Sequence, residues 1–203
     1  EPFTQPSTEN FYQNETDALA ALTASYARLK SGIGYYKQQF MPTLFASSDQ
    51  GLSTYLYNEF KRGIVTSTNQ SLNNLWKELY LGIREANNVI ANVPNIDMDE
   101  ELKHRIIGEA KFLRALHYFN LVRCFGEVPL RTSPVEAGDD QGLAVSTIVE
   151  IYDSIIDDLN YASLHCWGRN ESRGNYTNDL GRATNTSAHA LLAKVYTRIE
   201  SCK

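Results

Sequence analysis

Apolar residues recur every three or four positions through most of the chain, which is the spacing of one face of an α-helix. The longest such stripe covers 72–93 and is closed by Pro94. A shorter stripe follows Asn14, a residue type that suits a helix start, and stops near Gly32. Another follows Thr147, which can form a capping box with Glu150. The pattern therefore predicts helices over 14–32, 72–93, 100–125, 148–162 and 186–199.

The stretch 100–125 carries apolar residues on more than one side of the predicted helix. Positions 102, 106, 110 and 113 form one stripe, and positions 112, 115, 116, 119 and 122 form another. A helix that is apolar on several sides must be packed between neighbours. Gly126 can adopt the left-handed conformation that ends helices, and Pro129 cannot continue one, so the predicted end lies near Phe125.

The order of the elements predicts a stack of helix pairs. Two long helices joined by a connection as short as 94–99 are expected to be antiparallel neighbours. Trp76 and Leu79 follow the tetratricopeptide pattern, although Tyr80 stands where that pattern has glycine. Strand periodicity is confined to short runs near 64–66 and 128–130, and irregular segments cover 32–70, 131–145 and 165–182. We predict an all-α fold of tetratricopeptide-like stacked helix pairs with long irregular loops.

Length and composition fit a single domain over residues 1–203. Of these 203 residues 42% are hydrophobic, which is enough to bury one core. A net charge of −5 argues against binding to nucleic acid, which needs a basic face. No apolar stretch approaches the roughly 18 residues that cross a bilayer. The chain starts at Glu1 without an initiator methionine or a signal peptide, as a processed or trimmed chain would.

No group of residues in the sequence has the arrangement of an active site. The histidines lack metal-ligand spacing, and neither a nucleophile motif nor a phosphate-binding loop occurs, so we expect no enzyme activity, no metal and no cofactor. We interpret His117 as a hydrogen-bonded core histidine and Cys124 as a small buried hydrophobic residue. The acidic residues beside the 148–162 stripe are interpreted as a solvated face: Glu150, Asp153, Asp157 and Asp158.

Three stretches of the chain together resemble the SusD/RagB family of Bacteroidetes outer-membrane nutrient-binding lipoproteins. The first is WKELYLGI at 76–83, followed by Ala86 and Asn87. The second is GEAKFLRALHYFNLVRCFGEVPL at 108–130, and the third is GRAT at 181–184 leading into the helix that contains 188–196. Their order and spacing agree with the family over most of the chain, and three separate signatures are hard to obtain by chance.

The resemblance implies a right-handed stack of tetratricopeptide-like helix pairs, in agreement with the pattern. It also implies a surface-exposed protein of the outer membrane, held there by a lipidated cysteine that this chain lacks, so we expect the membrane to be contacted through that anchor alone. Family members capture oligosaccharide or another nutrient and deliver it to a TonB-dependent transporter. They are usually more than twice this long, so residues 1–203 are expected to be an N-terminal portion.

The irregular segment from Tyr35 onward combines aromatic rings with polar groups, which is what a sugar-binding site requires. The resemblance places ligand contacts in this segment, and starch-binding members present a tryptophan there, which this chain lacks. The missing tryptophan argues against an α-glucan as the ligand. Trp76 itself is assigned to the core, because it lies on the apolar stripe of its helix. The expected ligand-binding residues are Asp49, Tyr55, Tyr57 and Asn69.

Two other functions remain open on the sequence alone. Stacked helix pairs commonly bind proteins, so the chain can instead be a docking module for the transporter or another protein. A secreted eukaryotic glycoprotein is the other possibility, which a bacterial origin would exclude. It is permitted by glycosylation sequons at Asn14, Asn69, Asn170, Asn175 and Asn185.

Overall fold

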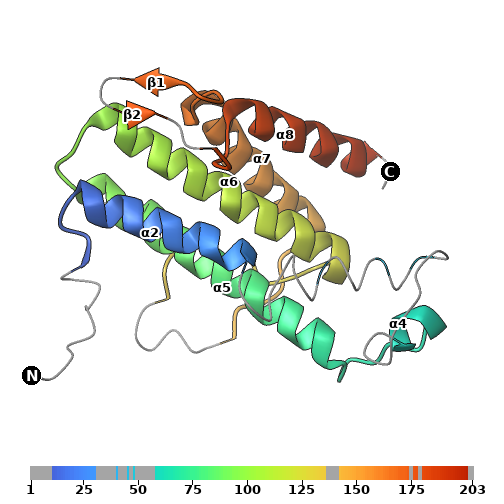
Figure 1. The fold of residues 1–203 in the computed structure, drawn as a ribbon. Helices are drawn as coiled ribbons and strands as arrows, with labels where there is room; N and C mark the ends of the chain where they lie inside the picture. Colours follow the sequence, from blue (N-terminus) through green and yellow to red (C-terminus); the bar gives the residue numbers. More distant parts are fainter. Residues whose placement is uncertain are drawn as a thin grey trace, which may run out of the picture.

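The computed structural model describes residues 11–30, 40, 45, 48, 58–135, 142–173, 176–177 and 180–200, and all structural statements below concern these residues. Long helices dominate this part of the chain (Figure 1). The helices are α2 (Glu15–Ala27), α4 (Asn58–Arg62), α5 (Gln70–Asn92), α6 (Glu100–Phe125), α7 (Ile148–His165) and α8 (Asn185–Glu200). Short 3₁₀ turns follow α2 at Arg28–Lys30 and α5 at Val93–Asn95.

The helices pack as neighbours in chain order, which confirms the predicted all-α fold. Helix α6 packs against α5 and α7, and α7 in turn packs against α8. Helix α2 lies along α5 and α6, so that α6 has neighbours on several sides (Figure 1). None of the described helices is both long and apolar enough to cross a membrane.

Side chains at the helix starts explain why the elements begin where the sequence predicts. Asn14 accepts a hydrogen bond from the backbone N–H of Asp17, and Asp99 accepts one from Leu102 at the start of α6. Thr147 and Glu150 form the predicted capping box at the start of α7. At the other end of α6, Gly126 has φ +74° and ψ −130°, so the φ is positive as predicted but the conformation is not the left-handed helical one.

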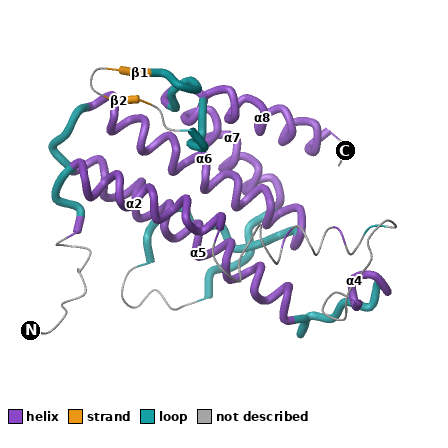
Figure 2. The backbone as a smooth tube through the Cα atoms, viewed as in Figure 1, coloured by secondary structure: helices purple, strands orange, loops and turns teal. Residues whose placement is uncertain are grey.

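Two short strands lie between α7 and α8, where the sequence predicts only a polar loop (Figure 2). Strands β1 (Ser172–Arg173) and β2 (Tyr176–Thr177) pair antiparallel. Of the two runs with strand character, 64–66 forms no strand, and Val128 forms a single bridge with Ser146. Strands this short leave no periodic signal, because period-two alternation needs four or more residues.

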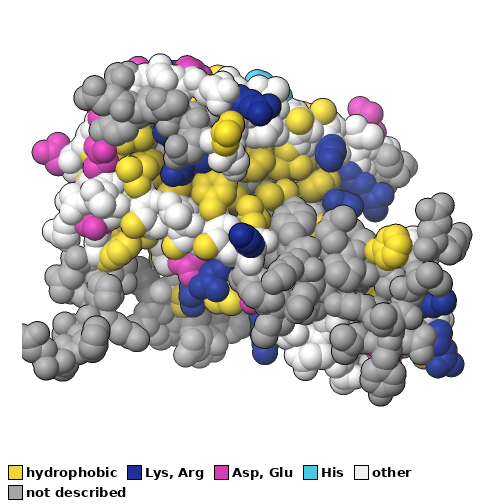
Figure 3. All heavy atoms as spheres, viewed as in Figure 1, with side chains coloured by type: hydrophobic (Ala, Val, Ile, Leu, Met, Phe, Trp, Pro, Cys, Tyr) yellow, Lys and Arg dark blue, Asp and Glu magenta, His cyan; other side chains and the backbone are white. Residues whose placement is uncertain are grey.

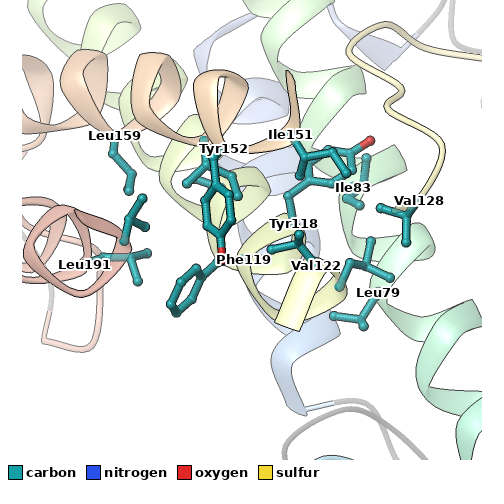
Figure 4. Packing of buried hydrophobic residues seen from close by; sticks show 14 of the residues in the cluster. Leu79, Ile83, Tyr118, Phe119, Val122, Val128, Ile151, Tyr152, Leu159 and Leu191 are labelled. Atoms are coloured by element: carbon teal, nitrogen blue, oxygen red, sulfur yellow. The ribbon is translucent and has the colours of Figure 1, made fainter. Parts of the chain in front are cut away.

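Helix α6 lies at the centre of the hydrophobic core, as its apolar stripes predict. One face contributes Tyr118, Phe119 and Val122 to a cluster with residues of α5, α7 and α8 (Figure 4). Another contributes Leu102, Ile106 and Leu113 to a cluster with residues of α2 and α5. These contacts bury α6 over most of its length, which also buries its charged residues.

The buried Arg114 of α6 forms a hydrogen-bond network that joins this helix to α7, to α5 and to the segment after α6. Its guanidinium donates to both carboxylate oxygens of Asp158 on α7, each at 2.7 Å. It also donates to Oδ1 of Asn87 on α5 at 2.8 Å and to the carbonyl of Thr132 at 2.9 Å. Asp158 accepts a further bond from Lys111 at 3.1 Å. The solvated position predicted for Asp158 is therefore wrong, because this carboxylate is buried against two cations.

Glu109 is another buried charge on α6, and it connects α2 with the segment before α8. Its carboxylate accepts from Arg105 at 2.7 Å and from the Tyr26 hydroxyl at 2.7 Å, and Arg182 lies at 3.4 Å. The Tyr26 hydroxyl itself accepts from the backbone N–H of Ala183 at 2.7 Å. A fully buried carboxylate is thus matched by two cations and a hydroxyl.

His117 and Gly82 allow α5 and α6 to approach closely. The imidazole of His117 is fully buried, as predicted for a core histidine, and it faces Gly82 of α5. A Cβ atom at position 82 would lie 2.3 Å from Nε2 of His117, so no larger residue fits there without a shift. Cys124, in contrast, is exposed, so its predicted burial is wrong; of the two described cysteines, Cys166 is the buried one. Cys124 lies in the last turn of α6, on its exposed side.

Replacing Asp158 should destabilise the fold strongly. Asp158→Asn leaves the buried Arg114 without its counter-charge, and breaking a buried pair in this way costs about 3 kcal/mol or more in the free energy of unfolding. Urea unfolding monitored by circular dichroism measures this cost. Asp157→Asn, one residue away on the exposed face, is the matched control and should change the free energy by less than about 0.5 kcal/mol. Equal effects of the two variants would contradict the role of the network.

Stability should fall on acidification because of His117. Burial lowers the pKa of His117 from 6.5 to about 4, so the unfolded state binds the proton first as the pH falls. The contribution of neutral His117 to the free energy of unfolding is fully present above pH 6.5. It is lost between pH 6.5 and 4, and the loss amounts to about 3 kcal/mol. Urea unfolding across this window should give a shallower pH dependence for His117→Asn than for the native chain. The exposed-site control His189→Asn should retain the native slope.

Candidate ligand-binding cleft

An open cleft of about 430 Å³ lies beside the N-terminal half of α5, between this helix and the segment that follows α6. Trp76, Tyr80 and Arg131 line it, and they also line an adjoining hollow of about 230 Å³ that extends toward Leu143. The remaining lining of the main cleft comes from both sides: Lys77, Leu81, Ile83, Arg84 and Val135. Its surface is mainly apolar, with cations at the edge.

The spacing along α5 brings the two aromatic rings of the cleft together. Trp76 and Tyr80 are four residues apart, so they lie on the same face of the helix, and their ring centroids are 5.0 Å apart. The Trp76 ring also meets the Phe125 ring edge-on at 5.1 Å, at the end of α6. Trp76 is therefore half-buried: it packs on the core with one part and lines the cleft with the rest. The predicted core assignment of Trp76 is therefore correct only for the part of its side chain that packs on the core.

Hydrogen bonds from buried side chains hold the other wall of the cleft in place. The Tyr80 hydroxyl donates to the carbonyl of Pro129 at 2.8 Å. The Tyr118 hydroxyl accepts from the backbone N–H of Arg131 at 2.7 Å and donates to its carbonyl at 3.0 Å. Asn87 donates to the carbonyls of Arg131 and Ser133, at 3.0 and 3.1 Å. The segment 129–133 is thus fixed to α5 and α6 through the backbone of Pro129, Arg131 and Ser133, although it has no regular structure of its own.

The hydroxyl groups near the cleft stay protonated at any physiological pH. Burial is the main cause that raises the pKa of Tyr80, and the neighbouring Tyr118 raises it further. Burial likewise raises the pKa of Tyr118, to about 12. At the opposite edge Arg84 pairs with Glu85 at 3.0 Å, and Glu85 also accepts from Arg28 at 3.2 Å. The cleft therefore offers aromatic faces and hydrogen-bond donors, and its described lining holds no carboxylate.

Of the four residues predicted to bind ligand, one lies in the described part of the chain. Asn69 caps α5: its side-chain oxygen accepts from the backbone N–H groups of Ser71 and Leu72, at 3.0 and 3.2 Å, and its amide donates to Glu59 at 2.7 Å. It precedes Trp76 by two turns, about 10 Å along the helix axis. The predicted residues Asp49, Tyr55 and Tyr57 lie outside the described residues.

The sequence analysis missed Tyr80 and Arg131 and gave Trp76 a structural role only. The available signal was the aromatic pair at positions 76 and 80, where tetratricopeptide repeats have a glycine at the second position. Arg131 carries no such signal, because its position depends on side chains from α5 and α6 that are distant in sequence.

Histidines that are distant in sequence meet at the other end of α6, far from the cleft along this helix. Nδ1 of His104 lies 2.8 Å from the Tyr161 hydroxyl, and the His104 and His165 rings stack with centroids 4.9 Å apart. Within the described ranges no three histidine, cysteine, aspartate or glutamate side chains gather as metal ligands would. Stacked rings direct their nitrogen lone pairs along parallel planes, so this pair does not converge on one ion either.

Comparisons with known proteins agree with this architecture. A SusD-like family model, described as starch-binding and associating with the outer membrane, matches residues 4–197. The SusD-like protein P25 of Formosa agariphila is 28% identical over 93% of this chain and 37% of its own length. A laminarin-binding SusD-like protein of known structure superimposes with a TM-score of 0.77 at 34% identity, covering 92% of this chain and 40% of that one.

A crystal structure solved with a xylogluco-oligosaccharide is also similar, with a TM-score of 0.72 at 30% identity over 87% of this chain. The chain spans 34 to 40% of the length of these relatives. The match of the family model over nearly the whole sequence, together with the shared fold, shows the family. The chain belongs to the SusD-like family, whose description is starch-binding and associating with the outer membrane.

Proposed function

We propose that this chain binds an oligosaccharide in the Trp76–Tyr80–Arg131 cleft and acts without covalent chemistry. The observation that carries the proposal is the open, mainly apolar cleft with two aromatic rings on one face of α5. The apolar face of a sugar ring packs on an aromatic ring, and its hydroxyls need donors and acceptors close by. Laminarin and xylogluco-oligosaccharide binding by similar proteins supports a carbohydrate as the ligand.

The cleft is suited to binding rather than catalysis. Glycoside hydrolysis needs two carboxyl groups placed across the scissile bond, and the described lining of the cleft carries cations instead. Capture at the cell surface through a lipid anchor, followed by delivery to a TonB-dependent transporter, completes the proposal. The family description, which associates these proteins with the outer membrane, supports this location. Protein docking as the main role of the chain stays the alternative prediction.

The residues expected from the sequence extend the proposed site beyond the cleft. Asp49, Tyr55, Tyr57 and Asn69 are proposed to contact the ligand as well. Asn69 supports this extension in one respect, since it lies at the same end of α5 as Trp76. Its cap uses both lone pairs of the oxygen, and the contact with Glu59 leaves one amide hydrogen for a ligand.

Removing the Trp76 ring should weaken glycan binding. Trp76→Ala deletes the largest aromatic surface of the cleft, and we expect about tenfold lower affinity for a bound glucan such as laminarin or a xyloglucan oligosaccharide. Isothermal titration calorimetry measures the change, and circular dichroism checks that the variant is folded. Trp76→Phe keeps a ring and should lose less.

Tyr196→Ala is the matched control for this experiment, because Tyr196 is exposed on α8 away from the cleft and its removal should leave the affinity unchanged.

The purified chain should release no reducing sugar from any glycan that it binds. Unchanged affinity of Trp76→Ala, or sugar release that one carboxylate substitution abolishes, would overturn the proposed function.

The contribution of Asn69 to binding can be separated from its cap. Asn69→Ser keeps a capping oxygen, so the free energy of unfolding should change by about 0.5 kcal/mol or less, whereas Asn69→Ala should cost about 1 kcal/mol. If the amide contacts the ligand, Asn69→Ser should bind laminarin several-fold more weakly in calorimetry. An affinity equal to that of the native chain would limit Asn69 to its structural role.

A further inference from the structure

A second hollow, here called the α6–α8 groove, lies between the last turns of α6 and the outer face of α8. Its volume is about 630 Å³, and its floor includes Phe119 and the small residue Ala193. Three cations surround it: Arg123 from α6, and Lys194 and Arg198 from α8. Figure 3 shows Lys and Arg side chains gathered on the right of the view, over the C-terminal part of α8.

The charges of the groove are not neutralised within the described part of the chain. All three cations are exposed, and none forms an ion pair with a described carboxylate. The Arg123 guanidinium lies over the Phe119 ring, 5.0 Å from its centroid. The nearest acidic residues along the sequence, Glu127 and Glu200, do not line the groove. The net charge of the chain is −5, so the positive charge of this groove differs in sign from the chain as a whole.

The arrangement is unfavourable for the free protein. Lys194 and Arg198 are four residues apart on α8, so their like charges lie on the same face of the helix and repel each other. Arg123 faces them from α6 across the groove. A ligand that brings negative charge between the three side chains would relieve this repulsion, and an arginine held over a ring is already positioned for such a contact.

The last turn of α6 connects the groove with Trp76, a residue that lines the cleft. Phe125 contacts Trp76 of the cleft at 5.1 Å, and the neighbouring residue Cys124 lines the groove. One helix separates the two hollows, a width of about 10 Å. A chain of a few sugars that packs on Trp76 can therefore reach the cations of the groove. An acidic peptide would have no comparable use for the aromatic cleft, so the observations favour a glycan.

We propose that the glycan bound by this protein is anionic, and that Arg123, Lys194 and Arg198 bind its carboxylate or sulfate groups in the α6–α8 groove. This inference rests on the proposed function for the ligand being a glycan, and it adds the charge of the ligand and a second contact region.

Affinity electrophoresis and calorimetry with three glycans test the proposal. Polygalacturonate carries carboxylates, dextran sulfate carries sulfates, and laminarin is the neutral probe. The variant Arg123→Gln/Lys194→Gln/Arg198→Gln should bind one or both anionic glycans about tenfold more weakly at ~50 mM salt, as three exposed charge contacts predict, and should bind laminarin like the native chain. The difference should largely disappear at ~0.5 M salt.

A control variant removes the same charge elsewhere. Lys30→Gln/Lys61→Gln/Arg169→Gln changes three exposed cations that line neither hollow, and it should retain native affinity for all three glycans. Equal anionic-glycan affinities of the groove and control variants would overturn the inference. So would binding of polyglutamate, and of neither anionic glycan, through the same three residues, because this result assigns the groove to an acidic protein.

The same data separate this inference from the proposed function. Binding of laminarin that depends on Trp76 but is accompanied by no groove-dependent binding of an anionic glycan would leave the proposed function standing and refute the anionic ligand. Absence of binding to every glycan would refute both.

Discussion

The burial of α6 on several sides is the constraint on which the rest of the structure depends. A helix in this position must bring polar residues into the interior, and four of these are charged: Lys103, Arg105, Glu109 and Arg114. Desolvating a guanidinium or a carboxylate is costly, so each must meet an opposite charge in good geometry. Arg114 meets Asp158 of α7, and Glu109 meets Arg105 and Arg182. The Arg114–Asp158 pair thus joins α6 to α7, and Glu109 joins α6 to the segment before α8.

The same interactions that complete the core also shape the cleft. Arg114 donates one hydrogen bond to Asn87 and one to the carbonyl of Thr132. Asn87 in turn donates to the carbonyls of the residues on either side of Thr132, Arg131 and Ser133. Tyr118, a core residue, holds Arg131 through both backbone groups. An irregular segment thereby gains a defined course from buried side chains of the helices. These hydrogen bonds preorganise the cleft wall, which lowers the entropic cost of ordering it when a ligand binds.

The sequence predicted the parts of the fold that depend on local signals. Helix periodicity and capping residues such as Asn14 and Thr147 act within a few positions, and the helices begin there. The expectations for Asp158 and Cys124 failed for a different reason. Asp158 is buried because Arg114, 44 positions away, needs a counter-charge, and periodicity carries no information about such a partner. The role of Trp76 in the cleft depends equally on the distant segment that forms the opposite wall.

The contact between Gly82 and His117 restricts how the two longest helices can move. A buried imidazole that rests in the space left by a missing side chain opposes sliding of α5 along α6, because displacement by even one residue would drive the ring into a neighbouring side chain. The aromatic residues of the cleft belong to α5, and its opposite wall is anchored to both helices. The cleft is therefore built on two helices whose relative register is fixed, and its shape does not depend on shear between them.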